Sequence, residues 1–206
     1  LGGIQNAGFL VLSVAIVIFP DRFDRFAAYL FLFLIGFDLV LWSLGKVLIT
    51  SGSDSVFKLK EVITPPLITM VASILVVLFG LKGLVPDVVM NAADLIGSAT
   101  VPMAMAVLGL TLGEVSLKQW PPLIDIIKIM SVKYLMLPFL TAGVLLLLSG
   151  FIKDPLLGDL MILEASAAPA TSIMIQISNY GGDHQKVGSM MIVAYGLVLF
   201  FMPFWI

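Results

Sequence analysis

The chain consists almost entirely of apolar segments about 20 residues long, separated by short polar turns. The segments run approximately over residues 3–19, 26–49, 61–80, 86–112, 121–149, 155–180 and 187–206. Each is long enough to cross the hydrocarbon core of a bilayer as a helix. Irregular backbone cannot face lipid, so the polar turns belong at the membrane surfaces. The sequence therefore predicts an all-α integral membrane protein with about seven transmembrane helices.

Composition excludes several classes of protein. The chain is 60% hydrophobic and 12% charged, whereas a soluble domain is about 25% charged. The net charge of -2 is small and scattered, so no nucleic-acid partner is expected. Cysteine is absent and His184 is the single histidine, which excludes disulfides and cysteine or multi-histidine metal sites. The apolar composition leads us to expect a multi-pass protein of the inner membrane. No nucleophile–base pair is evident at membrane depth, so we do not expect an enzyme, and we expect no cofactor.

Basic residues suggest an orientation. One set of turns and segment ends contains Lys46, Lys58, Lys60, Lys118 and Lys186, and the other contains Arg22, Arg25, Lys82 and Lys153. Cytoplasmic loops carry an excess of Lys and Arg. The rule places the first set in the cytoplasm and therefore the C-terminus outside.

The segment "LEASAAPATSIMIQISNYGGD", residues 163–183, predicts a broken helix inside the membrane. Pro169 follows a run of small residues, and proline both removes a helix hydrogen bond and clashes with the preceding turn. A break at this depth persists only where protein buries it or where it lines a water-filled cavity. Pro102 and Pro138 predict irregularities in two further spans.

A second break is expected near the N-terminus, in "GGIQNAGF". An alignment that places Asn6 on Pro169 also places Trp42 on Trp205, and it pairs two units separated by an odd number of spans. Such units have opposite orientations, and inverted repeats with discontinuous helices are typical of secondary transporters. Each break leaves a helix N-terminus whose free N–H groups can hold a carboxylate. The side-chain amides of Gln5 and Asn6 can bind either a carboxylate or a sodium ion.

Four charged positions within the predicted spans matter: Asp38, Lys133, Glu164 and Asp94. Asp94 lies in the first third of its span, where an interfacial cap is the alternative. A charge at the centre of a membrane helix costs about 2.5–3.5 kcal/mol on insertion scales. We expect these groups to include the binding site for a coupling proton or sodium ion. The alternative for Lys133 and Glu164 is a structural ion pair, or snorkelling towards an interface.

Four motifs resemble the auxin efflux carrier family. They are "QNAGFLVLSVAIVIFPD", "TPPLITMVASILVVLFG", "GSATVPMAMAVLGLTLG" and "EASAAPATSIMIQISNYGGD". The likeness is to bacterial members, which are often assigned to malonate, malate and similar organic acids. The first motif departs from the family pattern, since Val11 and Ser13 stand where the family has Gly and Pro.

The resemblance implies a ten-helix fold of two inverted five-helix repeats, each with a broken crossover helix. The first three helices would be missing here, which makes the chain N-terminally incomplete. Residues 1–49 would end the first repeat, 50–60 would be a cytoplasmic linker, and 61–206 would form the second repeat. Within the second repeat, 61–112 would belong to a scaffold and 121–206 to the transport unit. A homodimer through the scaffold helices is compatible with this arrangement.

The function implied by the resemblance is secondary active transport of a small organic anion by alternating access. Asn6, Pro169 and Ala170 match the crossover positions, and Thr171 and Ser172 would be neighbouring contacts. Coupling to protons or sodium, as in symport, stays open. The alternatives are a sodium-coupled symporter of the bile-acid type and a seven-helix membrane sensor or receptor that binds its ligand without moving it.

Overall fold

The computed structural model describes residues 3–40, 65–113, 115, 120–174, 177 and 183–206. In this part of the chain the elements are helices, and the one β-type contact is an isolated bridge between Gln5 and Pro169. The all-helical prediction is confirmed for these residues. The helices are α1 (Phe9–Ile18), η1 (Pro20–Arg22), α2 (Phe23–Val40), α5 (Pro65–Leu78), η3 (Leu81–Leu84), α6 (Asp87–Gly113), α7 (Leu123–Ser131), η4 (Val132–Met136), α8 (Leu137–Leu147), α9 (Pro155–Ser166) and α11 (His184–Trp205).

Three described stretches are long and apolar enough to cross a membrane as continuous helices: Asp87–Leu110, Leu123–Leu147 and Gln185–Trp205. Two shorter apolar helices cover Phe9–Ile18 and Leu67–Leu78. These helices agree with the predicted multi-pass membrane protein. The span predicted over 155–180 is not one helix, because α9 ends at Ser166. The second half of the span predicted over 26–49 and the linker 50–60 lie outside the described residues.

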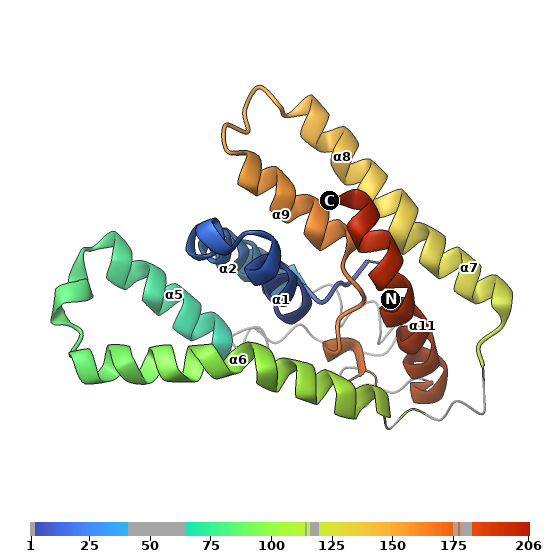
Figure 1. Cartoon of the computed structure of the whole chain (residues 1–206), viewed down its shortest axis with the longest axis horizontal. Helices are drawn as coiled ribbons and strands as arrows, with labels where there is room; N and C mark the ends of the chain where they lie inside the picture. The colour runs from blue at the N-terminus through green and yellow to red at the C-terminus, as the bar shows by residue number, and fades with distance from the viewer. Residues whose placement is uncertain (1–2, 41–64, 114, 116–119, 175–176, 178–182) are drawn as a thin grey trace, which may run out of the picture.

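The helices form a packed bundle and an extended arm (Figure 1). The bundle contains α1, α2, α9, α11 and the continuous helix formed by α7, η4 and α8. Its core includes fully buried apolar side chains from several helices, among them Val11, Phe26, Leu160 and Met191. The arm consists of α5 and α6, whose described residues are all at least partly exposed. Apolar exposure of this kind suits helices that face lipid or further protein.

Pro138 produces a bulge in its span and not a break. It has no N–H to donate to the carbonyl of Tyr134 four residues earlier, and its ring crowds that carbonyl. The backbone relaxes into a π-helical turn, η4, immediately before Pro138. The freed carbonyl of Tyr134 accepts a hydrogen bond of 2.9 Å from Nε1 of Trp205 on α11. In contrast, α6 runs without interruption through Pro102.

A charged contact joins α2 to the start of α9. Asp154 is the N-cap of α9, and its Oδ1 accepts a hydrogen bond of 3.1 Å from the Leu156 N–H. Its Oδ2 accepts a hydrogen bond of 2.6 Å from the Tyr29 hydroxyl and lies 2.7 Å from Nη2 of Arg25. The Tyr29 hydrogen bond, with the Leu156 N–H and the Arg25 charge, holds the pKa of Asp154 below its usual range.

This contact predicts a pH-dependent contribution to stability. Because the pKa of Asp154 is lower in the folded chain, its stabilisation is present above the unfolded value of about 3.9 and is lost as the pH falls through the folded value. Asp154→Asn keeps an oxygen acceptor but removes the charge. We expect its melting temperature in detergent to lie below that of the wild type at pH 7, and the difference to shrink as the pH falls below about 4. A difference that stays constant between pH 7 and pH 3 would contradict this account.

Close packing at Gly188 gives a second prediction. A Cβ at this buried position would lie 2.5 Å from Cγ2 of Val115, which follows α6. Gly188→Ala should therefore lower the free energy of unfolding by about 1–3 kcal/mol, because α11 must move away from Val115. The matched control is Gly196→Ala on the same helix, where nothing lies within 4 Å of the added carbon. Thermal unfolding in detergent should show a lower melting temperature for the first variant alone.

Candidate functional site

The two predicted breaks pair with each other through their backbones. The Asn6 N–H donates to the Ala168 carbonyl at 2.7 Å, and the Ala170 N–H donates to the Ile4 carbonyl at 3.2 Å. Between these bonds Gln5 and Pro169 lie opposite each other in antiparallel register. We call this pairing of residues 4–6 with 168–170 the crossing. Figure 1 shows the N-terminal segment, in blue, meeting the connection that follows α9, in orange.

The sequence explains why the chain is extended at the crossing. α9 ends at Ser166, and Ala167 adopts extended angles, with φ -66° and ψ 151°. The residue before a proline is disfavoured in the helical region, which keeps Ala168 extended as well. The hydrogen bonds are made by the residues on either side of Gln5 and Pro169, so this is a non-hydrogen-bonded pair. Pro169 has no N–H, and at this position none is required.

Tyr195 of α11 fastens both strands of the crossing. Its hydroxyl accepts a hydrogen bond of 2.8 Å from Nδ2 of Asn6 and donates one of 2.9 Å to the Pro169 carbonyl. Asn6 is buried, with 5% of its surface exposed. The Asn6 amide is therefore already committed to the architecture of the crossing through one of its donors. Gln5 is partly exposed.

A helix begins on the far side of each break. α1 starts at Phe9, and no side chain caps it. The second helix begins after Ala170, where the N–H groups of Ile173 and Met174 bond the carbonyls of Ala170 and Thr171. Thr171 and Ser172 are partly exposed at this start. Helix starts carry unsatisfied N–H groups and a partial positive charge, so the crossing has the elements of an anion-binding site.

Two buried charged groups lie behind the crossing. Lys133 in η4 is fully buried, and Glu164 in the last turn of α9 is 1% exposed. They interact electrostatically, and the Gln5 amide also approaches the Glu164 carboxylate. Among the described residues, however, neither Nζ of Lys133 nor either carboxylate oxygen of Glu164 has a hydrogen-bond partner. Asp38 lies on α2, and its side chain is outside the described part of the structure.

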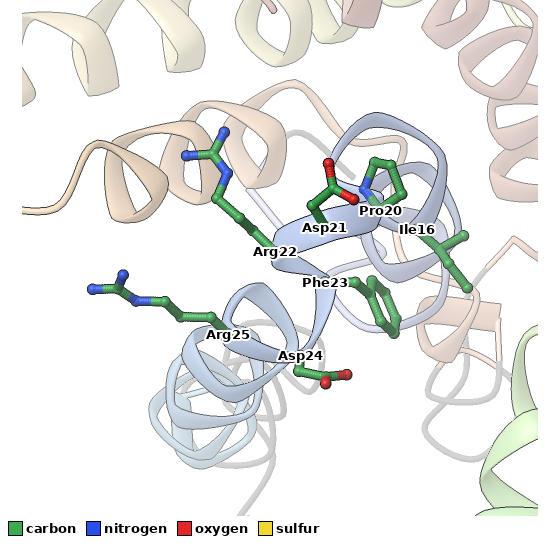
Figure 2. Close-up of a pocket in the computed structure, with 7 residues that line it drawn as sticks. All are labelled: Ile16, Pro20, Asp21, Arg22, Phe23, Asp24 and Arg25. Carbon is green, nitrogen blue, oxygen red and sulfur yellow. The ribbon is translucent and has the colours of Figure 1, made fainter.

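A separate open hollow lies at the turn between α1 and α2. It is lined by Ile16, Pro20, Asp21, Arg22, Phe23, Asp24 and Arg25. Figure 2 shows Arg22 and Arg25 extending to the same side, away from Ile16 and Phe23. Because Arg25 is paired with Asp154 and the hollow lies in a predicted interfacial turn, we assign it to the membrane surface and not to the candidate site.

The structure brings Gln5, Asn6, Pro169 and Ala170 together, with Thr171 and Ser172 next to them. Tyr195 and Tyr134 were not among the residues predicted from the sequence. A tyrosine inside an apolar span was the available signal, because a buried phenol hydroxyl usually finds a hydrogen-bond partner. Tyr134 donates a hydrogen bond of 2.6 Å to the Ala194 carbonyl, next to Tyr195.

Tyr195→Phe should loosen the crossing. The variant leaves the Asn6 amide and the Pro169 carbonyl without this partner, which should cost about 1–3 kcal/mol of stability. Hydrogen–deuterium exchange in detergent should become faster in residues 4–10 and 168–174. Tyr134→Phe is the control, since it also removes a buried hydroxyl but one that does not contact the crossing. Equal exchange of both segments in Tyr195→Phe and wild type would show that Tyr195 does not hold the strands together.

Comparison with known proteins identifies the family. Residues 45–206, more than half of the chain, match the model of the family described as membrane transport protein. The matched region includes α5 to α11 and the Pro169 strand of the crossing. No curated protein and no solved structure matches the chain significantly. The chain thus belongs to the membrane transport protein family, the auxin efflux carrier type of transporter that its motifs resemble.

Proposed function

We propose that the chain forms the substrate-binding part of a secondary active transporter for a small organic anion, a mono- or dicarboxylate. Family membership supplies the general activity, membrane transport. The observation that carries the rest is the crossing, where two extended segments, each followed by a helix start, pair by backbone hydrogen bonds. Discontinuous helices of this kind form substrate sites in secondary transporters, with helix starts directed at anionic groups.

The chemistry of the crossing suits a carboxylate. The helix starts after residues 8 and 170 offer N–H groups and partial positive charge. Gln5, Thr171 and Ser172 are partly exposed beside them and can donate further hydrogen bonds. The amine of Lys133, buried behind the strands, adds a positive charge in its protonated form.

The packing suggests which parts move. The bundle of α1, α2 and α7 to α11 shares one hydrophobic core, whereas α5 and α6 bury no described residue. A body with its own core can rock or slide as a unit and expose the crossing to each side of the membrane in turn. In this proposal α5 and α6 belong to a static scaffold, which also mediates a homodimer. The two broken units are inverted repeats divided by the linker 50–60, and the C-terminus lies outside an inner membrane.

Two rivals make different predictions. A sodium-coupled symporter of the bile-acid type would take up its substrate only with a sodium gradient. A membrane sensor or receptor would bind the anion but not move it across a vesicle. The crossing favours a transporter over the sensor, because a broken helix pair exposes one site to both sides with little rearrangement.

Uptake of radiolabelled malonate and malate into proteoliposomes tests the proposal. The wild type should move at least one of them faster than empty vesicles. Pro169→Ala should partly restore helical hydrogen bonding across the break and lower uptake by roughly tenfold, the effect of about 1.4 kcal/mol on the crossed conformation. Pro102→Ala is the matched control, because α6 is continuous at Pro102. Binding of malonate without movement would favour the sensor, and full activity of Pro169→Ala would make the break incidental.

A further inference from the structure

Three charged atoms in the bundle lack hydrogen-bond partners among the described residues. They are Nζ of Lys133 and both carboxylate oxygens of Glu164. Their side chains are 0% and 1% exposed. A buried charge without a partner is strongly destabilising, and ionisable residues at membrane depth usually mark ion pathways or proton relays. The pair therefore requires an explanation that simple packing does not give.

The position of the pair links it to the crossing. Lys133 lies near the middle of the stretch Leu123–Leu147, on the π-helical turn. Glu164 lies in the last turn of α9, directly before the extended strand. Gln5 approaches the Glu164 carboxylate from the opposite strand of the crossing. A change of charge at Glu164 is thus felt at the place where we propose that the substrate binds.

Other charged groups do not neutralise Glu164. On α2, Arg25 is engaged by Asp154 at the opposite end of α9. On α11, Lys186 pairs with Asp125 near the start of that helix, and Tyr195 contributes only a neutral hydroxyl at the crossing. α8 contains no ionisable residue. Among the described groups that face Glu164, Lys133 is consequently its one source of positive charge, and the two do not form a hydrogen-bonded pair.

The end of α9 makes the ionised form of Glu164 less favourable still. The C-terminal end of a helix carries partial negative charge from its free carbonyl groups, which repels a carboxylate. Protonation removes this repulsion and converts one carboxylate oxygen into a hydrogen-bond donor. It also leaves the positive charge of Lys133 unbalanced, so a second anion becomes favourable nearby. Proton binding and anion binding at this place should therefore assist each other.

We propose that Glu164 is the proton-binding site of the transporter and that Lys133 exchanges its counter-charge between Glu164 and a substrate carboxylate. A proton from water on the open side binds the Glu164 carboxylate to give the neutral acid. One substrate carboxylate then enters the crossing and balances the Lys133 ammonium. On the other side the substrate leaves, and Glu164 releases its proton to water and again balances Lys133. No covalent bond other than the carboxyl O–H forms or breaks.

Charge balance provides the coupling. The empty site, with ionised Glu164 and protonated Lys133, has zero net charge. The loaded site, with neutral Glu164, protonated Lys133 and a substrate that carries one ionised carboxylate, such as hydrogen malonate, also has zero net charge. Either half-loaded site carries an unbalanced charge in a buried environment, which disfavours the conformations that must pass through the membrane interior.

The proton site can be tested without substrate. Infrared difference spectra of the reconstituted protein between pH 5 and pH 9 should contain a carboxylic-acid carbonyl band that Glu164→Gln removes. Asp159→Asn is the control, because Asp159 lies on the same helix but is more exposed, and it should leave this band unchanged. In Lys133→Gln the band should persist to a pH higher by roughly one to three units, since the balancing charge is gone. The double variant Lys133→Gln/Glu164→Gln, which keeps the site neutral, should fold and show no such band.

The coupling role rests on the proposed function and is tested with radiolabelled malonate in proteoliposomes. In the wild type, an outside-acid pH gradient should drive accumulation. Glu164→Gln imitates the protonated state, so it should lose pH-driven accumulation by tenfold or more, as an order-of-magnitude expectation, while malonate–malonate exchange continues. Lys133→Gln should lose both, because the substrate then has no balancing charge.

Each failure has a distinct meaning. The proton site is refuted if no acid band depends on Glu164, or if a sodium gradient and not a pH gradient drives accumulation. It is also refuted if Glu164→Gln still accumulates malonate under a pH gradient. A wild type that neither exchanges nor accumulates malonate or malate would instead refute the proposed function, and the infrared titration would still decide whether Glu164 binds a proton.

Discussion

A broken helix inside a membrane must find hydrogen-bond partners for the backbone that it exposes, because lipid offers none. Here the two breaks supply them to each other. The Asn6 N–H bonds the Ala168 carbonyl and the Ala170 N–H bonds the Ile4 carbonyl, so each segment satisfies backbone groups of the other. This mutual dependence fixes where α1 and the helix after Ala170 begin. It also places segments from opposite ends of the chain at one point, and the proposed binding site follows from that meeting.

Helix α11 stabilises both irregular places with aromatic side chains. Trp205 donates to the Tyr134 carbonyl that Pro138 leaves free, and Tyr195 donates to the Pro169 carbonyl at the crossing. In both bonds, the polar atom of an aromatic side chain on α11 finds a hydrogen-bond partner in the interior of the bundle. α11 thus holds the π-helical turn carrying Lys133 in a fixed relation to the crossing. The buried charges and the candidate substrate site belong to one connected piece of structure.

The sequence was enough to predict which residues meet at the crossing, but it was not enough to predict the geometry of the structure around them. Proline, small residues and amides were enough to align Asn6 with Pro169, since they report directly on backbone that cannot remain helical. The π-helical turn at Pro138 was not predicted, because a proline in a span can also leave the helix continuous, as Pro102 in α6 shows. The role of Tyr195 depends on how α11 packs across the breaks, which is a tertiary contact that local patterns do not encode. For the same reason the sequence left an ion pair open for Lys133 and Glu164.

Burying Lys133 and Glu164 close enough to interact, but without a shared hydrogen bond, is a poor arrangement for stability alone. Replacing such a pair by apolar side chains is often neutral or stabilising, so a chain that needs only packing has no use for it. A transporter does have a use. A direct, well-formed ion pair would hold Lys133 too firmly to exchange partners, whereas a loose pair lets a proton and a carboxylate replace one charge by another at similar energy. In the mechanism that we propose, the looseness that costs stability allows the site to be neutral both empty and loaded, which is the condition for coupling.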